Sequence, residues 1–155
     1  MSIEIRRAMV ADAETVQTML GELADYQDQR VYMTASVADW QGYLARDEVV
    51  VLIAEVDGDA AGYVSALRRP YLWVGGDQLA LDDLYVREQF RDAGVGRQLM
   101  LALARFALPD RLPISWGLRL ENTAGYRFYE RLGAKLVTKT VAGWSPEAYE
   151  RQLSE

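Results

Sequence analysis

The sequence predicts an α/β domain whose sheet is antiparallel in its first half and joined by parallel crossovers in its second half. Three observations lead to this prediction. A strand pattern opens the chain, two helical stretches and a strong hairpin signal follow, and strand and helix patterns then alternate. The 155 residues fit one domain over residues 1–155, and half of them are hydrophobic, which is enough to form a core.

Each expected element has its own signal in the sequence. Residues 3–8 alternate like a strand, Asp12 and Ser36 precede two stretches with apolar residues at helical spacing, and β-rich runs flank a hairpin turn at Asp57-Gly58. A loop containing Pro70, Gly75 and Gly76 follows. The later elements are expected to be strands at residues 79–86, 114–120 and 134–141, helices from about Gly94 to Pro109 and over 123–132, and a tail at 143–153 that fits either a short helix or an edge strand.

The composition excludes several kinds of chemistry. The chain has no cysteine and no histidine, so disulfides, thiolate nucleophiles and imidazole acid–base catalysis are ruled out. Carboxylates alone make a poor zinc site, so we expect no metal. Proton transfer must then depend on Asp, Glu, Tyr, Lys or the N-terminus.

Charge and hydropathy limit the partners of the protein. The formal net charge is −6 with a pI near 4.8, which disfavours nucleic acid and favours cationic partners such as amines, although a solvated acidic surface explains the same charge. No apolar run approaches the roughly 18 residues of a membrane span, and the first residues lack the apolar core of a signal peptide. We therefore expect a cytoplasmic protein with no membrane partner.

Two glycines stand two residues apart at the start of a predicted helix, in the stretch RDAGVGRQLM at residues 91–100. The first amides of a helix have no intrahelical partner, and Gly94 and Gly96 would let a pyrophosphate approach them without meeting a Cβ. Arg91 and Arg97 would add positive charge. A glycine-eased turn with solvated arginines explains the same residues, and the stretch lacks the third glycine of a dinucleotide fingerprint.

The residues around these glycines, and a second stretch further along the chain, resemble the motifs of a known protein family. Val86 followed by Arg91-x-x-Gly94-x-Gly96 resembles the acetyl-CoA motif V-x-x-x-x-[RQ]-x-x-G-x-[GA] of the GNAT superfamily of N-acetyltransferases. Residues 122–133, NTAGYRFYERLG, are similar to the second signature of that family, N-x-x-[AG]-x-x-x-Y-x-x-x-G. The resemblance implies a GNAT fold with a mixed central sheet of about six or seven strands, a splay between its two central parallel strands, and about four flanking helices. Many members form dimers, and residues 143–153 could serve a homodimer.

The resemblance also implies that acetyl-CoA is the co-substrate and indicates which residues hold it. The backbone of residues 91–97 would bind the pyrophosphate, the strand before it would bind the pantetheine arm, and Asn122 would form a hydrogen bond with the cofactor. The Val86 N–H would polarise the thioester carbonyl. The implied cofactor residues are Leu84, Tyr85, Val86, Arg91, Asp92, Ala93, Gly94, Val95, Gly96, Arg97, Asn122 and Tyr129.

Tyr129, Asp82 and Asp83 are the candidate catalytic residues. The resemblance places the Tyr129 hydroxyl near the thioester sulfur, where it could protonate the departing thiolate; the alternative is that it only packs its helix. Two aspartates in an apolar strand are costly unless they face a polar cleft. Strand alternation puts the two aspartates on opposite faces, with Asp82 on the face of Leu84 and Val86. We expect Asp82, in preference to Asp83, to be the base or the group that binds the amine. The alternative to this catalytic role is that one of the two aspartates forms an ion pair with an arginine.

The acceptor is expected to be a primary amine that attacks the thioester directly, since no cysteine could carry an acetyl-enzyme. Acidic and aromatic residues in the first helices and in the loop before Asp82 suit a small polycation, such as a polyamine or an aminoglycoside-like molecule. The substrate-binding candidates are Tyr26, Asp28, Trp73 and Asp82. A protein N-terminus or lysine as acceptor, and a non-catalytic CoA-binding domain, are the alternatives.

Overall fold

The computed structural model describes residues 1–154, which divide into two compact units at Gly117 and Leu118. The first unit contains the sheet and three helices, and the second contains two helices. In order, the elements of the first unit are β1 (Ile3–Arg7), η1 (Val10–Asp12), α1 (Ala13–Tyr26), η2 (Arg30–Tyr32), α2 (Val37–Leu44), β2 (Val49–Val56), β3 (Asp59–Pro70), β4 (Asp77–Val86), η3 (Glu88–Phe90), α3 (Val95–Ala107), η4 (Leu108–Asp110) and β5 (Ile114–Ser115). Those of the second are α4 (Thr123–Arg131) and α5 (Pro146–Leu153).

The sheet confirms the predicted change from antiparallel to parallel pairing. Its strands lie in the order β1-β2-β3-β4-β5, and the first three pairs are antiparallel, while β4 and β5 are parallel. The hairpin between β2 and β3 turns at Asp57 and Gly58, whose φ angles of 51° and 92° are both left-handed. A two-residue hairpin turn that matches the twist of its strands requires left-handed φ angles at both turn residues.

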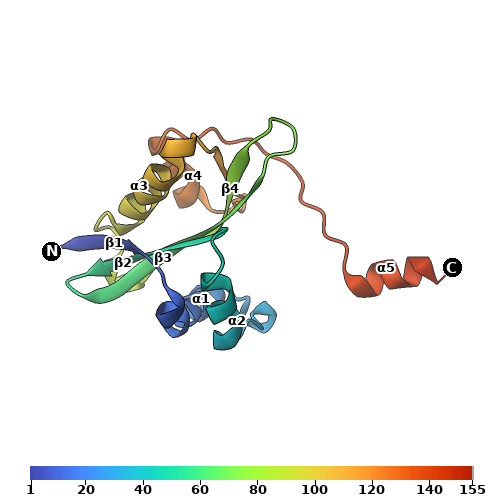
Figure 1. The fold of residues 1–155 in the computed structure, drawn as a ribbon, viewed down its shortest axis with the longest axis horizontal. Helices are drawn as coiled ribbons and strands as arrows, with labels where there is room; N and C mark the ends of the chain where they lie inside the picture. Colours follow the sequence, from blue (N-terminus) through green and yellow to red (C-terminus); the bar gives the residue numbers. More distant parts are fainter. Residues whose placement is uncertain (155) are drawn as a thin grey trace. The chain divides into compact units, whose positions relative to one another are not determined.

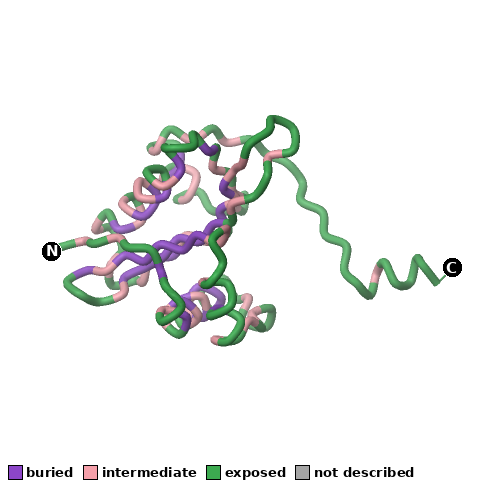
Figure 2. The backbone as a smooth tube through the Cα atoms, in the orientation of Figure 1, coloured by how far each residue is buried: buried purple, intermediate pink, exposed green. Residues whose placement is uncertain are grey.

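Helices cover both faces of this sheet in the first unit. Figure 1 shows α1 and α2 on one face and α3 on the other, and Figure 2 shows that the buried residues gather in the strands and on the helix sides that face them. Val16, Met19 and Leu23 of α1 pack with Ile53 and Tyr63 of the sheet. The apolar stripe of α3 is buried in the same way at Val95, Leu99 and Leu103. The helical spacing read from the sequence is therefore confirmed.

The predicted number of strands is wrong. The part of the chain that the structure describes has five strands rather than six or seven, and five α-helices rather than about four. The strand expected at 114–120 is reduced to Ile114–Ser115, and residues 134–141 form no strand. An apolar, β-rich run becomes a strand only where another strand accepts its hydrogen bonds, and Val137 and Val141 are exposed here. The ambiguous tail forms helix α5, which Ser145 caps and Pro146 begins.

Residues 1–154 contain neither a helix that could span a membrane nor a cluster of metal ligands. None of their helices is both long enough and apolar enough to cross a membrane. None of their His, Cys, Asp and Glu side chains form a group of three or more that could hold a metal ion.

Candidate active site

Strand β4 has an irregularity at the two aspartates. Ser65 pairs with Asp83 and its neighbour Ala66 pairs with Leu81, so Asp82 is an extra residue with no partner on β3. Such a bulge breaks the two-residue alternation of a strand. The predicted placement of Asp82 on the same face as Leu84 and Val86 assumed unbroken alternation. That alternation does not hold through β4. Asp83 is in register on the face that carries Tyr85, toward α1, while Asp82 is exposed.

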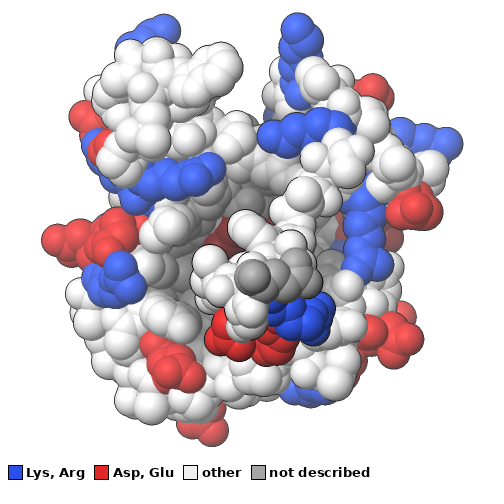
Figure 3. All heavy atoms as spheres, turned by 90° about the vertical axis from the view of Figure 1, so that its right-hand side faces the viewer, with Lys and Arg blue, Asp and Glu red and all other residues white. Residues whose placement is uncertain are grey.

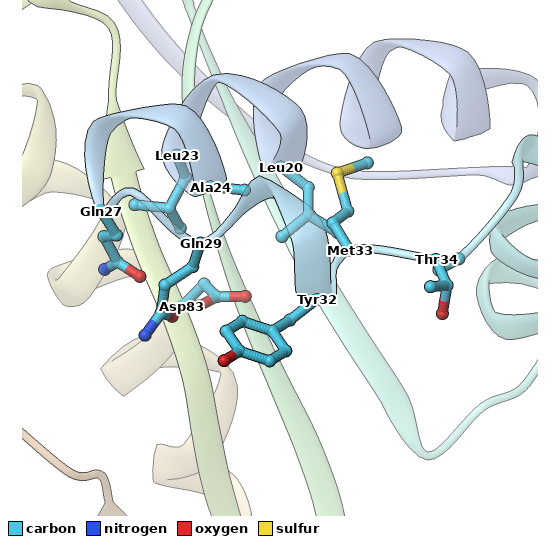
Figure 4. Close-up of a pocket in the computed structure, with 10 residues that line it drawn as sticks. Leu20, Leu23, Ala24, Gln27, Gln29, Tyr32, Met33, Thr34 and Asp83 are labelled. Atoms are coloured by element: carbon cyan, nitrogen blue, oxygen red, sulfur yellow. The ribbon is translucent and has the colours of Figure 1, made fainter.

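Asp83 forms one wall of a pocket of about 320 Å³. The other walls come from the C-terminal half of α1, from η2, and from the segment that leads to α2 (Figure 4). Asp83 is the charged member of an otherwise neutral lining. The neutral residues are Leu20, Leu23, Ala24, Gln27, Gln29, Tyr32, Met33, Thr34 and Ala35. The pocket therefore presents one carboxylate in uncharged surroundings.

The surroundings of Asp83 make its carboxylate more basic than usual. Burial raises the pKa of Asp83, the neighbouring Asp82 charge raises it further, and the Tyr63 hydroxyl lowers it. The Asp83 N–H donates to Ser65 Oγ at 3.2 Å, which fixes the backbone there. Partial burial raises the pKa of Asp82 as well, and the charge of Arg69 opposes that rise. A carboxylate with a raised pKa is suited to accept a proton near neutral pH.

An arginine fastens the η2 wall of the pocket to α1. Arg30 Nε and Nη2 donate to the two carboxylate oxygens of Asp25, each at 2.9 Å. The guanidinium lies across Gly21 of α1, so that a Cβ at this position would collide with Arg30 Nη1. A methyl group at Gly21 would therefore make this exposed, flexible guanidinium shift away from α1.

Two further carboxylates, one on α1 and one at the start of β4, are paired with arginines. Glu22 accepts from Arg87 Nε at 2.9 Å and from Nη2 at 2.8 Å, and it also accepts from the Tyr85 hydroxyl at 3.2 Å. Asp77 accepts from Arg68 at 2.8 Å. Figure 3 likewise shows basic and acidic side chains together on the face in view. These carboxylates are thus partly neutralised by the protein itself.

The predicted substrate-binding residues lie outside this lining. Asp28 is exposed, and Trp73 is 95% exposed in the loop before β4. Tyr26 is 71% exposed, and the Arg91 guanidinium lies 4.8 Å from the centre of its ring. Sequence reasoning missed the glutamines, Met33 and Thr34 of the wall. The helical spacing of Leu20 and Leu23 was a signal for α1, but it pointed to the core rather than to a pocket.

The glycine stretch forms the N-terminus of α3. Gly94 is the N-cap with a φ of 86°, and nothing lies within 4 Å of where its Cβ would be. The first hydrogen bond into the helix runs from the Gln98 N–H to the Gly94 carbonyl at 3.0 Å. The amides of Val95, Gly96 and Arg97 precede that bond and have no intrahelical partner. Such a terminus favours an anion through both its amides and its dipole.

The edge of β4 is open next to this helix terminus. β5 pairs with β4 only through Leu79 and Ala80. From Leu81 to Val86, the side of β4 opposite β3 has no strand partner among the described residues. The Val86 carbonyl accepts from Arg91 Nε at 2.9 Å, which ties the end of β4 to the glycine stretch. β4 and β5 are therefore paired over two residues only.

The second unit carries Asn122 and Tyr129. Asn122 caps α4, since its Oδ1 accepts from the Gly125 N–H at 2.9 Å. Gly133 follows the end of α4 with a φ of 85°, as is common after a helix. Tyr129 is buried, and burial raises its pKa. Its ring packs edge-on against the Phe128 ring, with 5.0 Å between the two ring centroids. The second signature therefore has clear structural roles in its asparagine and its last glycine.

Comparison with known proteins agrees with the motifs. The sequence model of the acetyltransferase (GNAT) family matches residues 15–134. The chain is 30% identical over 134 residues to an uncharacterized N-acetyltransferase of Archaeoglobus fulgidus, which covers 82% of this chain and 89% of the relative. It is 34% identical over 105 residues to aminoglycoside N(6')-acetyltransferase type 1 of Stenotrophomonas maltophilia, covering 64% and 63% of the two chains.

A solved structure shows the same fold. It is that of AAC(6')-Iy in complex with the bisubstrate analog CoA-S-monomethyl-acetylneamine, with a TM-score of 0.76 and 20% identity, covering 94% of this chain and 99% of the other. Enzymes of the GNAT family use acetyl-CoA. With the family match over residues 15–134, the chain is an acetyltransferase and belongs to the GNAT family.

Proposed function

We propose that this acetyltransferase moves an acetyl group from acetyl-CoA directly to a primary amine on a small cationic molecule. Strand β4 carries the proposal. Its open edge between Leu81 and Val86 leads to the unpartnered amides of α3, and its Asp83 lines a pocket on the α1 face. One strand thus links a site suited to an anion with a site suited to an amine.

The residues present fit acetyl-CoA. The open space around Gly94 and the amides of Val95, Gly96 and Arg97 suit a pyrophosphate. Leu84, Tyr85 and Val86 would hold the pantetheine arm by hydrogen bonds along the open edge, as an added strand would be held. Asn122 Oδ1 caps α4 in the second unit, and the proposed role of Asn122 toward the cofactor rests on the resemblance of the second signature. Bound there, acetyl-CoA supplies a thioester carbonyl that an amine can attack.

Asp83 is the base that we propose, ahead of Asp82. An amine is protonated in water at neutral pH and must lose a proton before its nitrogen can attack. The pKa of both aspartates is raised, but Asp83 faces the pocket, whereas Asp82 is the exposed extra residue of the bulge. Asp83 would take the ammonium proton, directly or through water. Asp82 remains the second candidate.

Two further groups complete the proposed transfer. The Val86 N–H would donate to the carbonyl oxygen as the amine nitrogen bonds to the acetyl carbon and the carbon–sulfur bond breaks. Tyr129 would give its proton to the departing thiolate. Burial raises the pKa of Tyr129, so the hydroxyl stays protonated at neutral pH, as an acid must before it acts.

The similarity to an aminoglycoside N(6')-acetyltransferase supports a small-molecule amine as acceptor. The test combines calorimetry with acetyl-CoA and thiol release across a panel of amines, protein N-terminal peptides and lysine peptides. Acetyl-CoA binding together with release that depends on a small amine is the expected result. Release only with peptides would favour a protein acceptor, and binding without any release would favour a non-catalytic domain. Absence of acetyl-CoA binding would contradict the proposal.

A further inference from the structure

We infer that the acceptor pocket selects an amine with a single ammonium group on an uncharged stem over a polycation of the same length. The inference rests on the proposed function and narrows its substrate class. Its basis is the distribution of charge around Asp83, which differs from the acidic pocket expected from the sequence.

The lining of the pocket offers one negative charge. Besides Asp83, its walls are apolar side chains of α1 and Met33, together with the neutral polar groups of Gln27, Gln29, Tyr32 and Thr34. Asp83 can pair with one ammonium group. A second ammonium held against this lining would lose part of its water without gaining a charged partner, which is unfavourable.

The two carboxylates of α1 beside the lining are already engaged. Glu22 and Asp25 lie on α1 among the residues that form the pocket wall. Glu22 is bound through both oxygens by Arg87, and Asp25 through both oxygens by Arg30. A polyamine could use either carboxylate only by displacing an arginine from a two-bond pairing. Asp28 and Asp82 are exposed and lie outside the lining, so the lining itself holds no second carboxylate for a cation.

The size of the pocket agrees with this class of ligand. Its volume of about 320 Å³ lies at the lower end of the roughly 300–1,000 Å³ of small-molecule sites. Leu20, Leu23 and Met33 offer apolar surface for a short stem, while the glutamine amides and Tyr32 can bind an uncharged polar substituent.

The direct test compares hexylamine with 1,6-diaminohexane, which differ by one ammonium group at nearly equal length. We expect kcat/KM for acetyl transfer to be at least about tenfold higher for hexylamine, because the second charge of the diamine is unpaired. Equal or higher kcat/KM for the diamine would overturn the inference and leave the proposed function standing. No transfer to any amine of the panel would overturn both.

A variant that adds a carboxylate to the pocket wall provides a second test, which does not depend on whether the wild-type protein prefers hexylamine. Gln29→Glu should move the ratio of the two kcat/KM values toward the diamine by about tenfold, since the second ammonium gains a partner. Both amines are compared within one variant, so a change in the pKa of Asp83 affects them alike. Gln41→Glu, on the exposed surface of α2 and outside the lining, is the matched control and should leave the ratio unchanged. An unchanged ratio in Gln29→Glu would count against the inference.

Discussion

Replacing Gly94 by alanine separates the two reasons for which a glycine could stand before α3. With a φ of 86°, any other residue at this position must adopt the left-handed conformation, which costs roughly 1–2 kcal/mol. The added methyl group meets nothing within 4 Å in the protein. We therefore expect only this conformational cost in stability, a decrease in Tm of about 2–8 °C for a chain of this size.

The effect on acetyl-CoA should be separate and larger. If the pyrophosphate lies against the first amides of α3, a methyl group on Gly94 pushes it away and lengthens at least one hydrogen bond to a charged group. The loss of one such bond is worth about 1.5–3 kcal/mol, or roughly a 10- to 150-fold weaker affinity. Calorimetric titration of the folded variant with acetyl-CoA measures this loss.

Gly58 provides a matched control for this substitution. It has a φ of 92° and equally open surroundings, but it lies in the β2–β3 hairpin turn. Gly58→Ala should lower Tm by a similar amount and leave the affinity for acetyl-CoA unchanged. If Gly94→Ala also kept the wild-type affinity, Gly94 would be a turn residue only, and the reasoning about the pyrophosphate would be refuted.

Three further predictions follow from the site. Tyr129→Phe should lower kcat by about 10²–10⁴-fold with little change in acetyl-CoA affinity; an equal kcat in steady-state assays would show that another group supplies the proton. Burial raises the pKa of Asp83, so ionisation of this carboxyl destabilises the fold as pH rises above the ordinary Asp pKa near 3.9. Asp83→Asn should therefore increase Tm more at pH 7 than at pH 4, and it should abolish activity. An equal change in Tm at the two pH values would contradict this. Gly21→Ala should displace Arg30 and raise the acceptor KM several-fold, whereas Gly42→Ala, with open space in α2, should leave that KM unchanged; equal KM values in the two variants would disprove the role of Arg30 in holding the wall.

Local signals in the sequence predicted the parts of the fold that depend on neighbouring residues. Asp57 and Gly58 form the expected hairpin turn because both tolerate left-handed φ angles. Gly94 caps α3 as the glycine stretch suggested, and the spacing of the two motifs indicates the family that the matched residues 15–134 show. Each of these features is determined within about a dozen residues of chain.

Features that depend on distant partners were not predictable in this way. The bulge at Asp82 exists in the pairing of β4 with β3, so alternation within β4 could not reveal it. The apolar run at residues 134–141 has strand character but no partner strand in the part of the chain described. The bonds between Glu22 and Arg87 join residues 65 positions apart, and they alter the charge of the expected acceptor pocket.

The central claim is that acetyl-CoA and a small amine react directly on this protein. The most direct measurement incubates the wild-type chain with acetyl-CoA and hexylamine and follows free thiol and N-acetylated amine together by mass spectrometry. The account predicts one N-acetyl product for each thiol released, with both lost in Asp83→Asn. Thiol release without the acetylated amine, or an acetylated protein in its place, would contradict it.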